Sequence, residues 1–263
     1  MTAAVSPAAW RAMTRRVVPA RVREWVQTQR RRYRLQRPRT GTVALGDLRR
    51  VTPISGAFGL ERGVPVDRYY IERFLGAYAP RIEGRVLEIG DDRYTRRFGG
   101  ERVLRSDVLH ATAGNPKATI VADLTRAGDL PAALFDCIIC TQTIQMIYDV
   151  RAALHHLHRL LKPGGVLLAT TAGIARIGRR EGIDPWGEYW HLTSQSAHRL
   201  FGEVFQPDGV EVKVYGNVLA AVAFLHGLAA EELRPDELDY LDPDYEVIIG
   251  IKAERAADGP GAQ

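Results

Sequence analysis

Polar residues follow four successive apolar runs in the middle of this 263-residue chain, and their types suit the binding of a ligand. They are Glu88 with Gly90, Asp107, Asp123, and Thr141 with Gln142. A glycine lets the backbone approach a ligand, and a carboxylate at a strand end accepts hydrogen bonds from ribose hydroxyls or amino groups. The alternative interpretation is that these are ordinary turn and helix-cap residues.

The elements that must position these residues alternate between strand and helix from residue 85 onward. The apolar runs predict strands at Val86–Ile89, Arg102–Ser106, Thr119–Val121, Cys137–Cys140 and Val166–Thr170. Asp107 and Asp123 are expected directly after the second and third of these. Leucines at helical spacing predict a helix from Val150 to Leu161, which Lys162-Pro163-Gly164-Gly165 should end. A second helix is expected over residues 66–75, with Asp67 as its N-cap. The pattern favours an open, mostly parallel sheet with helices on both faces.

Five segments carry a resemblance to a known family, and the last two are the most specific. They are VLEIG at 86–90, SDV at 106–108, ADLT at 122–125, FDCIICTQTIQMIYDVRAAL at 135–154 and RLLKPGGVLLAT at 159–170. The region 85–171 resembles the class I methyltransferases that use S-adenosylmethionine (SAM), especially the type-11 group. The resemblance implies a Rossmann-like, doubly wound α/β sheet of seven strands whose last strand is antiparallel. Tyr245–Ala253 would be that strand, paired with Gly209–Val214.

The same resemblance implies cofactor roles. Glu88 and Gly90 would contact the methionine end of SAM, Asp107 the ribose, and Val108 the adenine ring. Asp123 and Leu124 would bind the adenine edge, and Thr141 with Gln142 would line the methyl-transfer end. The family pattern acidic-x-Gly-x-Gly-x-Gly is broken here, because Asp92 and Tyr94 replace its last two glycines. Asp92 is included among the expected cofactor-binding residues because aspartate tolerates a positive φ better than most residues.

The segment 184–193, DPWGEYWHLT, is the candidate acceptor region. Trp186, Tyr189 and Trp190 would form an aromatic wall for a sugar ring or an apolar acceptor, or alternatively anchor the core. His191 is the candidate general base and Glu188 the group that orients it or the acceptor. SAM chemistry needs no metal, and none is expected.

Composition indicates a basic arm on a protein without disulfides. The first fifty residues hold thirteen arginines against Glu24 and Asp47, so they carry +11 and the remainder carries −6 (5 − 11). We expect a basic, helical or partly disordered N-terminal extension at 1–50, a methyltransferase domain at 51–255 and a disordered tail at 256–263. The arm suits an anionic partner, either nucleic acid or a membrane surface. The two cysteines and the absence of a long apolar run favour a cytoplasmic protein, with peripheral membrane attachment as one option.

The leading hypothesis is a SAM-dependent methyltransferase that acts on a small-molecule or glycan-like acceptor at oxygen. One alternative is a nucleic-acid methyltransferase that uses the arginine-rich arm. The other is a non-catalytic SAM-binding scaffold. The sequence leaves the acceptor and the oligomeric state open.

Overall fold

The computed structural model describes residues 19, 22, 25, 41–178 and 187–257. The chain divides into two compact units, Met1–Val51 and Thr52–Gln263. Within the described part of the first unit, a short 3-10 helix covers Gly46–Leu48. The predicted extension at 1–50 and the tail at 256–263 lie mostly outside the described residues.

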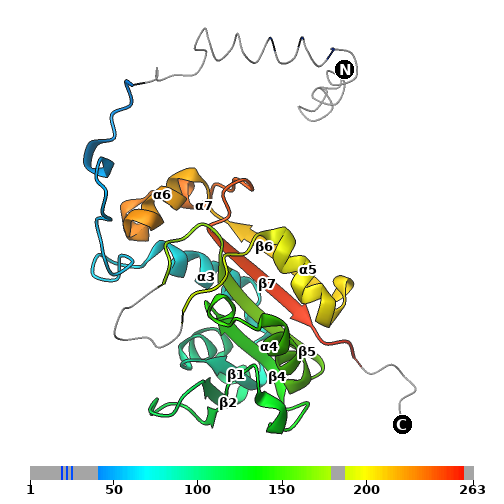
Figure 1. Cartoon of the computed structure of the whole chain (residues 1–263). Coiled ribbons are helices and arrows are strands. Elements are labelled where there is room, and N and C mark those ends of the chain that lie inside the picture. The colour runs from blue at the N-terminus through cyan, green and yellow to red at the C-terminus, as the bar shows by residue number, and fades with distance from the viewer. Residues whose placement is uncertain (1–18, 20–21, 23–24, 26–40, 179–186, 258–263) are drawn as a thin grey trace, which may run out of the picture. The chain divides into compact units, whose positions relative to one another are not determined.

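The second unit is built on one seven-stranded sheet with the order β3-β2-β1-β4-β5-β7-β6 (Figure 1). The strands are β1 Gly84–Ile89, β2 Val103–His110, β3 Ile120–Val121, β4 Phe135–Thr141, β5 Leu161–Ala172, β6 Val210–Tyr215 and β7 Ile248–Glu254. β1 to β5 are parallel, and β7 runs antiparallel to both β5 and β6. The predicted doubly wound α/β fold with an antiparallel last strand is therefore confirmed.

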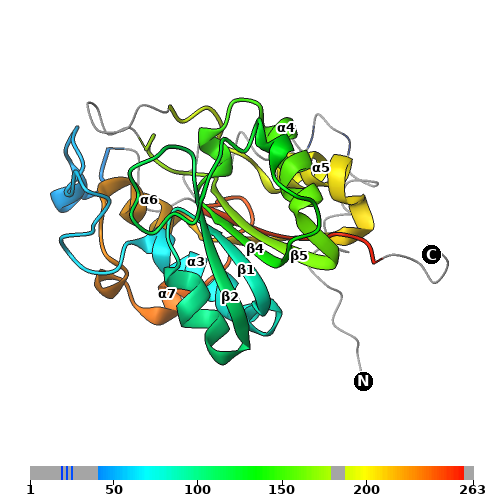
Figure 2. The ribbon, with the colours of Figure 1, turned by 90° about the horizontal axis from the view of Figure 1, so that it is seen from below.

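Five α-helices lie in the part of this unit that the structure describes. They are α3 Val66–Ala77, α4 Val150–Leu160, α5 Ser194–Phe205, α6 Val218–His226 and α7 Pro235–Asp239. Short 3-10 turns cover Ala79–Arg81, Gly100–Arg102, Ala127–Asp129, Ile144–Met146, Pro207–Gly209 and Ala230–Glu232, and one π-helical turn covers Thr95–Gly99. Figure 2 shows α4 and α5 on one side of the strands and α3, α6 and α7 on the other.

Two hydrophobic clusters fill the layers between the sheet and these helices. Cys140 belongs to the cluster under α4 and α5, and Cys137 to the cluster under α3 and α6. The two thiols of this CxxC sequence therefore lie on opposite faces, as expected for strand residues three apart. Because both faces of β4 are covered, its sequence is a continuous apolar run rather than an alternating one.

Two details of the helices follow from their sequences. Asp149 caps α4, since its carboxylate accepts the Ala152 N–H at 3.1 Å, and the helix ends at Leu160, just before the predicted stop. The prediction that Asp67 caps α3 was wrong. Pro65 is the N-cap, and Asp67 lies in the first turn, because proline fixes a backbone angle that suits a helix start.

The crossovers before β2 and β3 are reduced. A single π-helical turn, Thr95–Gly99, and a 3-10 turn join β1 to β2, and a loop without a helix joins β2 to β3. The segment after β1 therefore contains only short helical turns. Its residues Gly90, Asp91, Arg93 and Tyr94 line part of the cavity described below.

Candidate functional site

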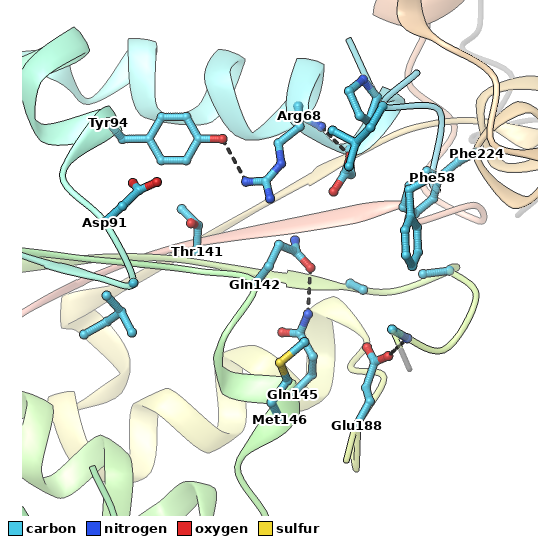
Figure 3. A pocket seen from close by; sticks show the side chains of 18 of the residues that line it. Phe58, Arg68, Asp91, Tyr94, Thr141, Gln142, Gln145, Met146, Glu188 and Phe224 are labelled. Atoms are coloured by element: carbon cyan, nitrogen blue, oxygen red, sulfur yellow. Dashed lines mark hydrogen bonds between the residues drawn. The ribbon is translucent and has the colours of Figure 1, made fainter. Parts of the chain in front are cut away.

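A cavity of about 440 Å³ opens at the carboxyl ends of β1 and β4. Five segments enclose it: the stretch before and into α3, the end of β1 with the loop after it, the end of β4 with the loop after it, the end of β5 with the chain that follows it, and helix α6. The lining residues are Phe58, Leu60, Pro65, Asp67, Arg68, Glu88, Ile89, Gly90, Asp91, Arg93, Tyr94, Thr141, Gln142, Gln145, Met146, Ala172, Ala175, Arg176, Gly178, Glu188 and Phe224. In Figure 3, Asp91 and Tyr94 lie at one end of it, Phe58 and Phe224 at the other, and Gln142 between them.

Gly90 makes the backbone accessible at the floor of the cavity. Its φ of +94° is unfavourable for other residues, and a Cβ placed there would meet nothing within 4 Å. Its N–H donates to the Leu109 carbonyl at 2.9 Å, and its own carbonyl accepts from Asn115 Nδ2 at 2.7 Å. The turn is thus held from both sides while its open face is left for a ligand.

Glu88 organises the loop that follows. Its carboxylate is 2% exposed and accepts the backbone N–H groups of Tyr94, at 3.2 Å, and Thr95, at 2.7 Å. Burial raises the pKa of Glu88 to about 7, and the two amide bonds only partly oppose that shift. A carboxyl group that changes charge near neutral pH therefore lies against the cavity.

The two residues that replace the family's glycines take different positions. The Tyr94 ring is buried with Phe98, and its hydroxyl accepts from Arg68 Nη1 at 3.0 Å. Asp92 does not line the cavity. Lys117 holds its carboxylate at 3.1 Å, and Arg96 pairs with it from the next turn. Burial raises the pKa of Asp92, but these two cations outweigh it and keep the pKa below its usual value.

Thr141, the last residue of β4, and Gln142, the first residue of the loop after it, line the cavity. Gln142 has a φ of 49°, an uncommon value for a residue with a side chain. Its N–H donates to Thr170, and its Oε1 accepts from Gln145 Nε2 at 2.7 Å. Its buried Nε2 has no hydrogen-bond partner among the described residues. A buried amide N–H without a partner costs free energy, so this position suits a ligand that accepts a hydrogen bond.

The expectation for Asp107 was wrong in its placement. β2 does not end there but continues to His110, because Val108 and Leu109 go on pairing with β1. The Asp107 carboxylate is 2% exposed and binds Arg85 at 2.8 Å, Arg105 at 3.1 Å and Thr119 at 3.0 Å. Burial raises the pKa of Asp107, but these bonds more than compensate and lower it.

None of the other residues expected at the adenine end lines the cavity. Val108 and Leu124 are core side chains, 3% and 4% exposed. Asp123 is exposed and closes its own turn, since its Oδ1 accepts from the N–H and hydroxyl of Thr125. The hydrogen bonds of Asp123 are therefore those of a turn residue. Its predicted contact with adenine stays a prediction.

The aromatic segment lies beside the cavity rather than in it. Trp186 is outside the described residues. Tyr189 and Trp190 are 52% and 39% exposed and pack against Tyr148, with ring centroids 5.4 Å and 6.1 Å away. Both donate their backbone N–H groups to the Gln145 carbonyl, at 2.8 Å and 3.2 Å. The three rings form an exposed platform fixed to a residue that lines the cavity.

Glu188 and His191 lie close together, but only Glu188 lines the cavity. Glu188 Oε1 lies 3.4 Å from His191 Nε2, and Oε2 accepts the Gly178 N–H. The Glu188 side chain is 4% exposed, whereas that of His191 is 32% exposed. The pair therefore links the cavity to solvent.

Several lining residues were not found from the sequence. Arg68, Arg176, Phe58 and Phe224 come from segments outside the recognisable motifs, and only the fold brings them to the cavity. Asp91 had a local signal, since it directly follows Gly90, but the family pattern distinguishes its neighbour Asp92, which stands at a glycine position. Among the described residues, no group of three or more metal-ligating side chains exists, and no helix is long and apolar enough to cross a membrane.

Comparison with known proteins agrees with this geometry. Residues 93–169 match the family model described as a methyltransferase domain. These residues therefore form a methyltransferase domain of the type-11 group. A domain of this group implies SAM as the cofactor.

Solved structures similar to this methyltransferase include a SAM-dependent methyltransferase from Archaeoglobus fulgidus, 12% identical, covering 71% of this chain and 94% of that one at a TM-score of 0.47. Another is from Mesorhizobium loti, 20% identical, covering 72% and 98% at a TM-score of 0.43. The [4+2]-cyclase SpnF is 16% identical, covering 75% and 85% at a TM-score of 0.47. The comparison with curated proteins finds no significant match.

The cavity of the methyltransferase fits the methionine end of SAM, which carries a carboxylate, an ammonium and a sulfonium. Gly90 leaves its backbone open, and Glu88 and Asp91 would supply carboxyl groups to the cationic centres. Arg68 and the unpaired amide of Gln142 would supply donors to the carboxylate. The donor set of the cavity is therefore complementary to this part of the cofactor.

Proposed function

We propose that this methyltransferase transfers the methyl group to a hydroxyl oxygen of a small-molecule or glycan-like acceptor that binds beside Glu188. The observation that carries the proposal is the buried Glu188 carboxylate, fixed by Gly178 and His191 at the wall of the cavity. Bound SAM supplies an activated methyl group, so the protein must position the acceptor oxygen and remove its proton.

Proton removal falls to Glu188 in this proposal, with His191 as its partner. Glu188 lines the cavity and His191 does not, so the carboxylate is the group within reach of an acceptor. The more exposed imidazole lies 3.4 Å behind it and can carry the proton toward solvent. This reverses the order expected from the sequence, in which His191 was the base and Glu188 its positioning group.

The aromatic platform of Tyr148, Tyr189 and Trp190 supports the choice of a ring-shaped acceptor. Exposed aromatic rings normally need a reason to stay ordered, and here two backbone bonds to Gln145 and the bond from Trp190 Nε1 to Ile147 provide it. Aromatic faces stack well on the apolar face of a sugar ring. We propose that this platform holds the part of the acceptor that projects from the cavity.

On the cofactor side, we propose that Glu88, Gly90, Asp91, Thr141 and Gln142, with Arg68, hold the methionine end. Asp92 then acts through the loop, because Lys117 and Arg96 already occupy its carboxylate. The predictions of an anionic partner and of a membrane or nucleic-acid role for residues 1–50 stay predictions.

The experiment is methyl transfer from labelled SAM to a panel of hydroxyl-bearing sugars and phenols, with the product located by mass spectrometry. Glu188→Gln should lower turnover about 100-fold or more, the usual contribution of a general base, and should leave the affinity for S-adenosylhomocysteine unchanged. Glu101→Gln is the matched control, because Glu101 is exposed and forms no ion pair with the residues that the structure describes. Label on nitrogen or carbon, or full activity of Glu188→Gln, would refute the proposal.

A further inference from the structure

Three arginines line the cavity, and two of them contact Tyr94 in the segment after β1. Arg68 donates to the Tyr94 hydroxyl, and Arg93 lies over the Tyr94 ring with its Cζ 5.5 Å from the centroid. Arg176 instead lies over Phe58, at 4.0 Å. Because Tyr94 and Phe58 stand at opposite ends in Figure 3, Arg176 belongs to the end away from the Gly90 loop.

The guanidinium of Arg176 lies against the face of the Phe58 ring, and it makes no ion pair or hydrogen bond with any residue that the structure describes. An arginine stacked on a ring keeps its five N–H donors in the plane of the guanidinium, where they can bind a carboxylate or phosphate in a forked geometry. The nearby Glu188 carboxylate is engaged by Gly178 and His191 instead.

The Phe58 platform is held in place at a conformational cost. Phe58 has a φ of 60°, in the left-handed region that bulky side chains avoid. The turn around it is fixed because Ser55 Oγ accepts the N–H groups of Ala57 and Gly59, and because the N–H groups of Ile54 and Ser55 donate to the His226 carbonyl. Gly59 also packs against the backbone of residues 227–228.

A tilted contact with Phe224, at 6.5 Å between centroids, supports the Phe58 ring from α6. Phe58 and Gln142 are two of only four non-glycine residues with a positive φ in the described part of the chain, and both line this cavity. Such strain persists at ligand sites where the surrounding structure maintains it. The position of the Phe58 ring is therefore fixed before a ligand binds, and the ring holds the Arg176 guanidinium in one place.

We infer that Arg176, stacked on Phe58, binds an anionic group of the methyl acceptor, either a carboxylate or a phosphate monoester. The inference rests on the proposed function and narrows its substrate class: the acceptor carries a hydroxyl that reaches Glu188 and an anion that reaches Arg176. The cavity wall also includes the apolar residues Ala175 and Phe224, and a less polar environment strengthens a charge interaction.

The test uses the full chain saturated with S-adenosylhomocysteine, so that the cofactor-end arginines are already engaged. Benzoate, phenyl phosphate and neutral benzamide are compared as probes by ligand-observed NMR titration. We expect benzoate or phenyl phosphate to bind at least tenfold more tightly than benzamide, and the tighter of the two identifies the anion. Arg176→Gln should abolish the preference, and Arg176→Lys should keep only part of it, because lysine retains the charge but not the fork.

Arg126→Gln is the matched control, since Arg126 is exposed and lies outside the cavity. Equal binding of benzamide and the anions, no binding of any probe, or an anion preference that survives Arg176→Gln would each overturn the inference. Calorimetry with S-adenosylhomocysteine on each variant separates the two proposals. Failure of the wild type to bind it refutes the proposed function, whereas normal binding without an anion preference refutes only the Arg176 subsite.

Discussion

The raised pKa of Glu88 makes the stability of the fold depend on pH in a calculable way. The pKa rises from 4.5 to about 7 because the carboxyl group is buried, so the native state holds a proton that the unfolded chain releases. The stabilising contribution of this proton is complete below about pH 4.5 and is lost as the pH rises through about 7. At about 1.4 kcal/mol per pKa unit, the full loss is on the order of 3 kcal/mol.

Glu88→Gln removes this titration with little change in size. The glutamine oxygen can still accept one of the two loop amides, from Tyr94 or Thr95, so the variant should fold with some constant loss of stability. Between pH 5.5 and 8.5 the wild type should lose about 2 kcal/mol of unfolding free energy relative to the variant. Urea denaturation of both proteins at fixed ionic strength measures this difference.

Other titrating groups cancel in the comparison. Burial also raises the pKa of Asp67, and burial with Arg255 nearby lowers that of His158, but both are present in wild type and variant. A difference that stays constant within 0.5 kcal/mol, on the order of the error of such extrapolations, would refute the assigned burial of a titrating Glu88. A difference of the opposite sign would show that the loop amides dominate instead.

Two further substitutions test the cofactor side. Asp107→Asn should destabilise the protein by about 2–4 kcal/mol, because it leaves Arg85 without its buried partner, and should leave the affinity for S-adenosylhomocysteine within twofold of wild type; a large loss of affinity with unchanged stability would restore the ribose role. Gly90→Ala should cost about 1–2 kcal/mol of stability, because the positive φ strains an alanine. It should also weaken S-adenosylhomocysteine binding severalfold, because the added methyl group would occupy open space at the cavity. Thermal melts measure the stability and calorimetry the binding, and unchanged binding would show that the ligand does not approach this backbone.

The fold was predictable because its signals are local. The leucine spacing of α4, the Lys162–Gly165 stop and the apolar strands each depend on nearby residues, and their order defines the sheet. Residues that line the cavity could be predicted where they directly follow a strand, as for Gly90 and Gln142. Asp107 was misplaced because an acidic residue inside a strand and one at its end look alike in sequence; only the two arginines around it separate them.

The altered loop after β1 now has a structural explanation. In a glycine-rich loop that opens a helix, backbone N–H groups face the ligand. Here the N–H groups of Tyr94 and Thr95 donate to Glu88, and the short helical segment that begins there includes a π-helical turn at Thr95–Gly99. Because those two amides are used internally, the contacts that they would make to a charged cofactor must come from side chains or from the backbone at Gly90. Arg68 is placed for this by its bond to Tyr94, the residue that displaced a glycine. Tyr94, which stands where the family has a glycine, therefore also holds Arg68, and Arg68 is the candidate side chain for the cofactor contacts that the backbone no longer makes.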